Sequence, residues 1–149
     1  MIKNRAGPNI PSILAPAPEA VSSGPGPRER KMRIENTTFG SITIDGKTYE
    51  HDVIIRLGGK VEKRRKKLSK EKYGTSHIVS KEEAKFVYEE GSDLLIIGAG
   101  QEGNVRLSPE ASDYFEKKGC AVSVQPTPEA IQSFNESRRK KIGLMHVTC

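Results

Sequence analysis

The sequence predicts an α/β fold, a compact three-layer domain with a mixed, largely parallel central sheet. From Ser80 to Val147 the chain alternates helical and strand patterns in three successive helix–strand units. Before them, residues 34–57 show the short alternating pattern of hairpin strands. Helices that alternate with apolar strands favour a layered fold with parallel strands, and the preceding hairpin strands make the sheet mixed.

The hairpin region has a clear turn. Ile42 and Ile44 alternate with polar residues, and Asp45-Gly46 follows them. This dipeptide favours a two-residue turn because glycine accepts positive φ. Residues 52–57 (DVIIRL) predict another strand, and residues 60–68 are expected to pair with it as a charged, exposed ribbon.

Each helix–strand unit begins with a capping pattern. Ser80 and Glu83 form a capping box, and Gly91 is expected to end that helix. The next two helices start at SPEA and TPEA, so Ser108 and Thr127 are the expected N-caps. The strands predicted after the three helices are LLIIG (94–98), CAVSV (120–124) and IGLMHV (142–147).

LLIIGAGQEG (94–103) contains the G-x-G-x-x-G pattern of dinucleotide-binding turns. However, residues 104–107 separate the glycines from the next helix, and the following strand ends Val124-Gln125-Pro126 without an acid for the ribose. The pattern therefore predicts no NAD or FAD cofactor. The loop should still lie at the carboxyl end of a parallel strand, where it can form the wall of a pocket for a small anionic ligand. The candidate contacts are Gly98, Gly100, Gln101, Gly103, Arg106 and Asn135.

The positive charge is local. The whole chain has a formal net charge of +6, and residues 60–72 alone hold eight basic and two acidic residues. Such a run can bind an acidic protein partner, a phosphorylated ligand or nucleic acid, or it can simply be solvated. Nucleic acid is disfavoured because no aromatic residue lies within the run to stack on bases. The candidate basic patch is Lys63, Arg64, Arg65, Lys66 and Lys67.

Residues 1–31 differ in composition from the rest. They contain six of the nine prolines and no aromatic residue, so they are expected to be a disordered extension. Met32 is hypothesised to be the biological start of a domain that spans 32–149. No apolar run approaches the ~20 residues that cross a bilayer, so no membrane association is expected. Two cysteines do not make a disulfide scaffold, which favours a cytoplasmic protein.

Metal binding and catalysis are not predicted. His146 and Cys149 have H-x-x-C spacing, but two ligands do not complete a zinc site, and residues three apart in a strand point to opposite faces. His51 and His77 could join them only by a coincidence of folding. Cys149 could act as a nucleophile with His146 as its base, yet the last residues of a chain often fray. Acidic pairs such as Glu82-Glu83 are interpreted as solvated helix faces.

Several motifs occur in the order found in a known family. LLIIGAGQ, LSPEASDYFEKKGCAVSVQPTPEAIQSFN and IGLMHVTC make residues 32–149 similar to the Mth-domain family, which includes adipogenesis-associated Mth-domain-containing protein and, more remotely, mitochondrial complex I assembly factor 3. The resemblance implies a compact three-layer α/β domain and brings no catalytic residue or cofactor. Its matching positions here are Gly98, Gly100, Asn135, His146 and Cys149. We therefore expect a non-enzymatic interaction or assembly module with a protein partner. The alternatives are an anionic ligand at the glycine loop and, third, nucleic acid at residues 60–72.

Overall fold

The structure is a computed structural model that describes residues 32–149. The expected extension 1–31 lies outside the described residues. Within residues 32–149, no helix is both long enough and apolar enough to cross a bilayer.

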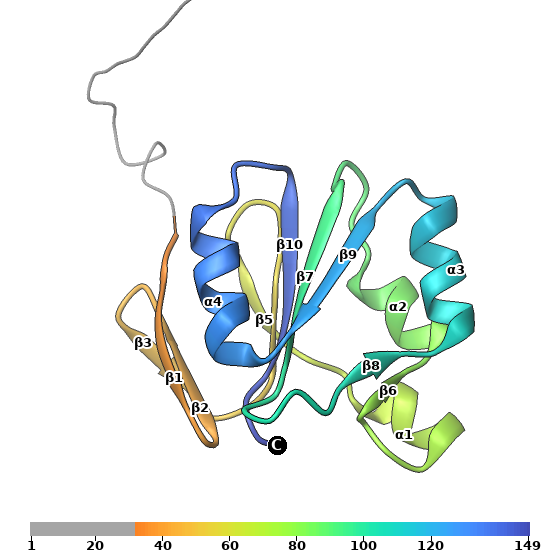
Figure 1. Ribbon diagram of the computed structural model, residues 1–149, viewed down its shortest axis with the longest axis horizontal. Coiled ribbons are helices and arrows are strands. Elements are labelled where there is room, and N and C mark those ends of the chain that lie inside the picture. Colours follow the sequence, from red (N-terminus) through yellow and green to blue (C-terminus); the bar gives the residue numbers. More distant parts are fainter. Residues whose placement is uncertain (1–31) are drawn as a thin grey trace, which may run out of the picture. The chain divides into compact units, whose positions relative to one another are not determined.

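A five-stranded mixed sheet forms the centre of the domain (Figure 1). Its strands, in spatial order, are β5 (Val61–Lys63), β4 (Val53–Ile55), β10 (Lys141–His146), β7 (Leu94–Ala99) and β9 (Ala121–Gln125). The pairs β10–β7 and β7–β9 are parallel, whereas β10–β4 and β4–β5 are antiparallel. The predicted mixed sheet is therefore confirmed, with the parallel pairs coming from the three helix–strand units.

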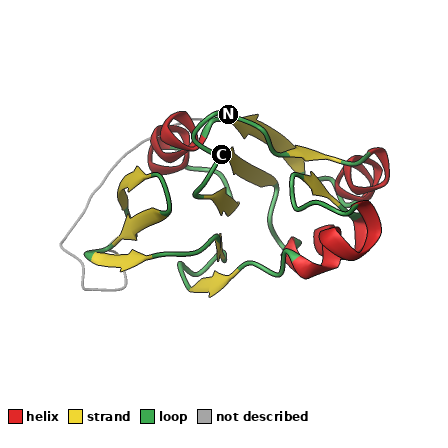
Figure 2. Cartoon of the chain, turned by 90° about the horizontal axis from the view of Figure 1, so that it is seen from below, coloured by secondary structure: helices red, strands yellow, loops and turns green. Residues whose placement is uncertain are grey.

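Both faces of this sheet are covered, which gives the predicted three layers. Helices lie on two sides of the strands when the domain is seen from below (Figure 2). One face packs against α2 (Lys81–Val87) and α3 (Pro109–Lys117). The other packs against α4 (Thr127–Glu136) and a small antiparallel sheet of β1 (Ile34–Thr38), β2 (Ser41–Ile44) and β3 (Lys47–Tyr49).

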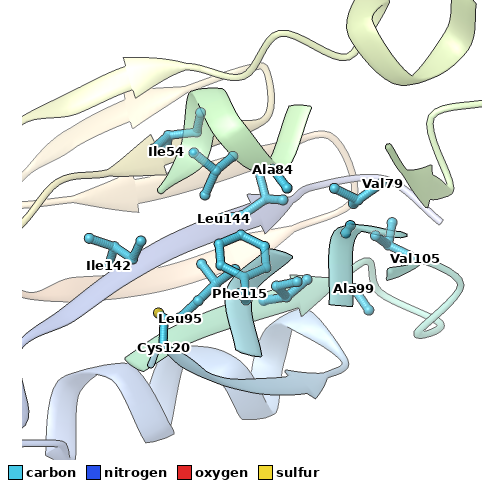
Figure 3. Close-up of a cluster of buried hydrophobic side chains, with 13 residues drawn as sticks. Ile54, Val79, Ala84, Leu95, Ala99, Val105, Phe115, Cys120, Ile142 and Leu144 are labelled. Atoms are coloured by element: carbon cyan, nitrogen blue, oxygen red, sulfur yellow. The ribbon is translucent and has the colours of Figure 1, made fainter. Parts of the chain in front are cut away.

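Each face has its own apolar core. On the α2–α3 face, Phe115 of α3 packs among side chains from the central strands, including Leu95 and Leu144 (Figure 3). On the α4 face, Phe134 and Ile131 meet Ile96 and Met145 of the central sheet. A strand buried on both faces reads as a continuous apolar run, which is the pattern of β7, where all six residues are buried.

Local sequence signals explain several boundaries. The two-residue hairpin turn is confirmed: Asp45 and Gly46 have φ of 50° and 82° between β2 and β3. The hydroxyls of Ser80 and Ser108 accept bonds from the amides of Glu83 and Ala111, so both serines cap their helices as predicted.

Three local predictions differ from the structure. The ribbon expected at 60–68 pairs with β4 only through β5, because β5 ends at Lys63 and the helix α1 (Lys67–Tyr73) begins shortly after. Helix α2 ends at Val87, before Gly91, because Tyr88 already has extended backbone angles. Thr127 is not an N-cap: Pro126 takes that position, and the Thr127 hydroxyl turns into the protein interior.

The structure also contains a small parallel pair of strands that was not predicted, β6 (Ile78–Val79) with β8 (Arg106–Leu107). It lies with α1 at the same end of the domain as the last residue of the chain (Figure 1). Two-residue strands carry no periodicity, so no sequence pattern could have shown them.

Candidate functional site

Arg64 is the centre of a buried ionic network. Its side chain is fully buried, and its Nε lies 2.6 Å from Glu83 Oε2 while its Nη1 lies 2.9 Å from Asp52 Oδ2. Its Nη2 donates to the carbonyl of Ser76 at 2.7 Å. One guanidinium therefore joins the start of β4, α2 and the loop before β6, because its planar fork of donors can serve several acceptors at once.

Glu83 enters this network from α2. The solvated interpretation of the Glu82-Glu83 pair was wrong for Glu83, which is fully buried. Its carboxylate also accepts from the hydroxyl of Ser69 in α1, and the Ser69 hydroxyl accepts from the amide of Ser80. In an ordinary capping box the glutamate would bind that amide itself. Here Ser69 takes this role, which leaves Glu83 to neutralise Arg64.

Asp52 and His146 extend the network to the end of β10. His146 Nδ1 lies 2.6 Å from Asp52 Oδ2, and the amide of Val147 donates to Asp52 Oδ1 at 3.0 Å. Burial alone would raise the pKa of Asp52, but the bond from His146, together with Val147 and Arg64, lowers it to about 2. Likewise burial disfavours the charged form of Arg64, yet the bonds to Glu83 and the nearby Asp52 raise its pKa. Both groups thus stay charged inside the protein.

A second cluster adjoins the first. His77, His146 and Cys149 each place one nitrogen or sulfur atom within 4.8 Å of the others. Cys149 Sγ lies 3.6 Å from His77 Nε2, and the two imidazole rings meet edge to face with centroids 5.4 Å apart. Burial, followed by the neighbouring His146 and Arg64, lowers the pKa of His77, which favours the neutral imidazole.

The opposite-faces argument therefore does not apply to His146 and Cys149. Strand β10 ends at His146, so Cys149 does not belong to the strand and its side chain need not follow the strand alternation. Val147 and Thr148 are also fixed by hydrogen bonds: Gly40 N–H donates to the Val147 carbonyl and Gln101 N–H to the Thr148 carbonyl, each at 2.7 Å. The neighbouring loops therefore bind the backbone of Val147 and Thr148.

The glycine loop uses its amides within the protein. Gly100 N–H donates to the Thr127 hydroxyl at 2.9 Å, Gln101 N–H to Thr148, and Gly103 N–H to the Gly100 carbonyl. A dinucleotide or phosphate site needs such amides free to face the ligand. The Gln101 side chain likewise donates to Thr37 Oγ1 at 3.0 Å.

Close packing explains two of the glycines. A Cβ on Gly98 would lie 2.7 Å from the sulfur of Met145, and one on Gly100 would collide with the backbone oxygen of Cys149. Gly100 also has φ of 100°. The glycines of this loop therefore let β10 and residues 147–149 pack closely against it.

The other two candidate contacts lie elsewhere. Arg106 is exposed on β8, where its amide donates to the His77 carbonyl at 2.8 Å. Asn135 of α4 binds both the amide and the carbonyl of Ile34, at 3.0 and 2.8 Å, and so acts as a backbone partner for the edge strand β1. Both residues therefore have backbone partners within the protein.

The predicted basic patch divides into a buried and an exposed part. Arg64 is buried, whereas Lys63, Arg65 and Lys67 are exposed and Lys66 is half-buried. With Leu68 and Lys70 these residues line an open hollow of about 450 Å³. The guanidinium of Arg65 lies 4.3 Å from the centre of the Phe86 ring.

Comparisons with known proteins identify the family. Residues 34–145 match the family named Protein of unknown function (DUF498/DUF598). The chain belongs to the DUF498 family. Conserved hypothetical protein PH1505 from Pyrococcus horikoshii OT3 is 37% identical, the match covers 78% of this chain and 99% of that one, and the TM-score is 0.74. For MT938 the values are 34% identity, 80% and 100% coverage, and a TM-score of 0.68.

The solved structures also define the fold of this DUF498 domain. A Mth938-like domain from Bordetella pertussis, solved by solution NMR, shares the fold at 14% identity, with 85% of this chain and 91% of that one covered and a TM-score of 0.55. The resemblance to the Mth-domain family is thus confirmed. The family is one of unknown function, so the function must be inferred from the site.

Sequence reasoning missed the most buried charges of this DUF498 domain. Asp52 directly precedes an apolar strand and His146 ends another, and both signals were visible as polar residues beside buried runs. Arg64 carried no such signal, because it stands among six other basic residues between positions 60 and 70. Only its contacts distinguish it from them.

Proposed function

We propose that this DUF498 domain is a non-enzymatic interaction module that docks an acidic segment of a protein partner on its basic surface. The basic surface consists of Lys63, Arg65, Lys66, Lys67 and Lys70. The observation that supports the proposal is that these cations surround one hollow of about 450 Å³.

The charges of the basic surface are available to a partner. Among residues 32–149, no carboxylate forms an ion pair with any of its side chains. Arg64, the one cation of the segment with two carboxylates, is the one that lies inside the protein. A field of unpaired cations attracts an acidic partner and speeds its association.

The basic surface is also held in place. Arg64 and Ser69, near the two ends of the segment from Lys63 to Lys70, both bind Glu83 of α2. Arg65 is held against Phe86, also of α2. A surface whose backbone is already ordered loses less conformational entropy when a partner binds.

An acidic protein segment fits this surface better than single-stranded nucleic acid. Nucleic-acid grooves usually add aromatic side chains on which bases stack. Phe86, whose ring contacts Arg65 of this surface, has Arg65 at 4.3 Å and Arg56 at 5.1 Å from its centre. With two guanidinium groups against it, this ring is not open for a base.

The test compares two triple variants of the full chain by fluorescence anisotropy. One variant carries Lys63→Gln, Lys67→Gln and Lys70→Gln. Its matched control carries Lys81→Gln, Lys85→Gln and Lys117→Gln, which remove three exposed lysines from α2 and α3. The probes are a fluorescent oligoglutamate peptide and a fluorescent oligothymidylate.

We expect the wild type to bind oligoglutamate, the first variant to lose about tenfold or more in affinity, and the control to stay within about twofold, since three charge contacts are lost in one place. Equal losses in both variants would mean that only the net charge matters and would contradict the proposal. Tighter binding of oligothymidylate than of oligoglutamate at moderate salt would favour the nucleic-acid alternative.

A further inference from the structure

We propose that His77, His146 and Cys149 bind a divalent transition metal of the zinc class. Their ligand atoms lie within 4.8 Å of one another, although the residues come from three places in the chain. His77 precedes β6, His146 ends β10, and Cys149 lies on the segment that follows β10.

The donor set is chemically selective. Imidazole nitrogen and thiolate sulfur are the ligands that zinc prefers, whereas magnesium and calcium take oxygen. With zinc bonds of about 2.0–2.1 Å to nitrogen and about 2.3 Å to sulfur, tetrahedral ligand atoms stand roughly 3.5 Å apart. Cys149 Sγ and His77 Nε2 are already 3.6 Å apart.

His146 has the support that metal-binding histidines usually have. A ligating imidazole commonly donates its second ring N–H to a carboxylate, which fixes the tautomer and the ring orientation. His146 Nδ1 lies 2.6 Å from Asp52 Oδ2, and Arg64 holds that carboxylate at 2.9 Å. This arrangement leaves Nε2 of His146 for the metal, where the Thr148 hydroxyl now lies at 3.1 Å.

The backbone around Cys149 is positioned by the glycine loop. A side chain on Gly100 would collide with the backbone oxygen of Cys149 and would lie 2.9 Å from the ring of His146. Gln101 N–H holds Thr148 from the same loop at 2.7 Å. The G-x-G turn thus brings the sulfur to the two imidazoles, which is the role that we assign to it in place of phosphate binding.

The site has room for a fourth ligand. Three protein ligands leave one position of a tetrahedral zinc ion open, as in catalytic zinc centres, where water or a substrate fills it. His77 and Cys149 are half-buried, so this position is reached from solvent. Zn²⁺ binds these residues with the cysteine as thiolate, and the thiol proton goes to the solvent.

The experiment is a titration of the full-length, chelator-treated protein with Co²⁺ under reducing conditions. Tetrahedral Co²⁺ absorbs visible light, and a bound thiolate adds a charge-transfer band in the near ultraviolet. We expect one equivalent of Co²⁺ to produce both features and one equivalent of Zn²⁺ to remove them by displacement. Absence of a tetrahedral spectrum at millimolar Co²⁺ would overturn the proposal.

The variants assign the ligands. Cys149→Ser should remove the charge-transfer band, and His77→Gln should weaken Co²⁺ binding by about tenfold or more, because each removes one ligand. Both residues are half-buried, and circular dichroism verifies that the variants fold. The matched controls are Cys120→Ser and His51→Gln, which replace the other cysteine and the other histidine and should bind as the wild type does. A charge-transfer band that survives in Cys149→Ser would contradict the proposed site.

Discussion

The segment from Lys63 to Lys70 has basic side chains on two sides, one buried in the protein and one facing solvent. On one side, Arg64 and Ser69 are buried and bound to Glu83. On the other, Lys63, Arg65 and other cations of the basic surface face solvent around an open hollow. The comparison teaches that position alone decides whether a positive charge holds the fold or is available to a partner.

The largest expected effect comes from Arg64→Ala. The substitution leaves the carboxylates of Asp52 and Glu83 buried without their cation. Removing one partner of a buried ion pair costs about 3–5 kcal/mol, so the free energy of unfolding in urea should fall by this amount.

The neighbouring Arg65→Ala is the control. It removes only the contact with Phe86 on the exposed side and should cost no more than about 1 kcal/mol. Equal losses of unfolding free energy in Arg64→Ala and Arg65→Ala would contradict the difference between the buried and the exposed side.

Glu83→Gln sharpens the comparison by keeping the shape of the side chain. The amide still fills the space, but it loses the charge-assisted bonds to Arg64 Nε at 2.6 Å and Nη2 at 3.1 Å. Bonds to charged groups contribute about 1.5–3 kcal/mol, so we expect a loss of about 2 kcal/mol. Glu82→Gln, on the exposed neighbour, should change stability by less than about 0.5 kcal/mol in the same urea titration. A larger loss in Glu82→Gln would contradict this assignment of the buried carboxylate.

The triple variant Lys63→Gln, Lys67→Gln and Lys70→Gln should leave the fold almost unchanged. All three side chains are exposed, and surface substitutions usually stay within about 0.5 kcal/mol each. The midpoint of thermal unfolding, followed by circular dichroism, should stay close to that of the wild type while binding of oligoglutamate falls. A large loss of stability would show that these lysines belong to the structural side.

The same contrast between buried and accessible groups extends to the two cysteines. Burial raises the pKa of the Cys120 thiol above its ordinary value of 9.0, with Ser92 acting weakly in the opposite direction. Because only the thiolate reacts, Cys120 should be alkylated by iodoacetamide more slowly than the half-buried Cys149 at pH 8. The raised pKa also means that the folded state resists ionisation, so its stability should fall as the pH rises above about 9. Peptide mass spectrometry of the alkylated protein measures the order of reaction, and faster labelling of Cys120 would contradict the prediction.

Much of the fold followed from short-range patterns. The capping serines Ser80 and Ser108 and the Asp45-Gly46 turn acted as predicted, because each depends on atoms only a few residues away. The order of three helix–strand units was visible for the same reason. The end of α2, where Arg56 binds the carbonyls of Phe86 and Val87, and the role of Thr127 were not, because tertiary contacts outweighed the local signals there.

The candidate sites were less predictable. The glycine loop matched a dinucleotide pattern, yet its amides bind Thr127 and Thr148 within the protein. A glycine motif indicates which backbone angles the loop can adopt. It does not indicate whether the loop amides donate to a ligand or to another part of the protein. The proximity of His77 to Cys149 could not be seen at all, since 72 residues separate them.

The sequence by itself determined the class of the domain, its alternating units and its family, because periodicity, caps and motif order are properties of neighbouring residues. Only the tertiary structure decided that Arg64 lies inside while Arg65 lies outside, and that two histidines and a cysteine meet beside a buried aspartate. The physical reason is that burial and electrostatic partners depend on which distant strands pair. In this domain that choice depends on β10, which lies between β4 and β7 and brings His146 to both Asp52 and the glycine loop.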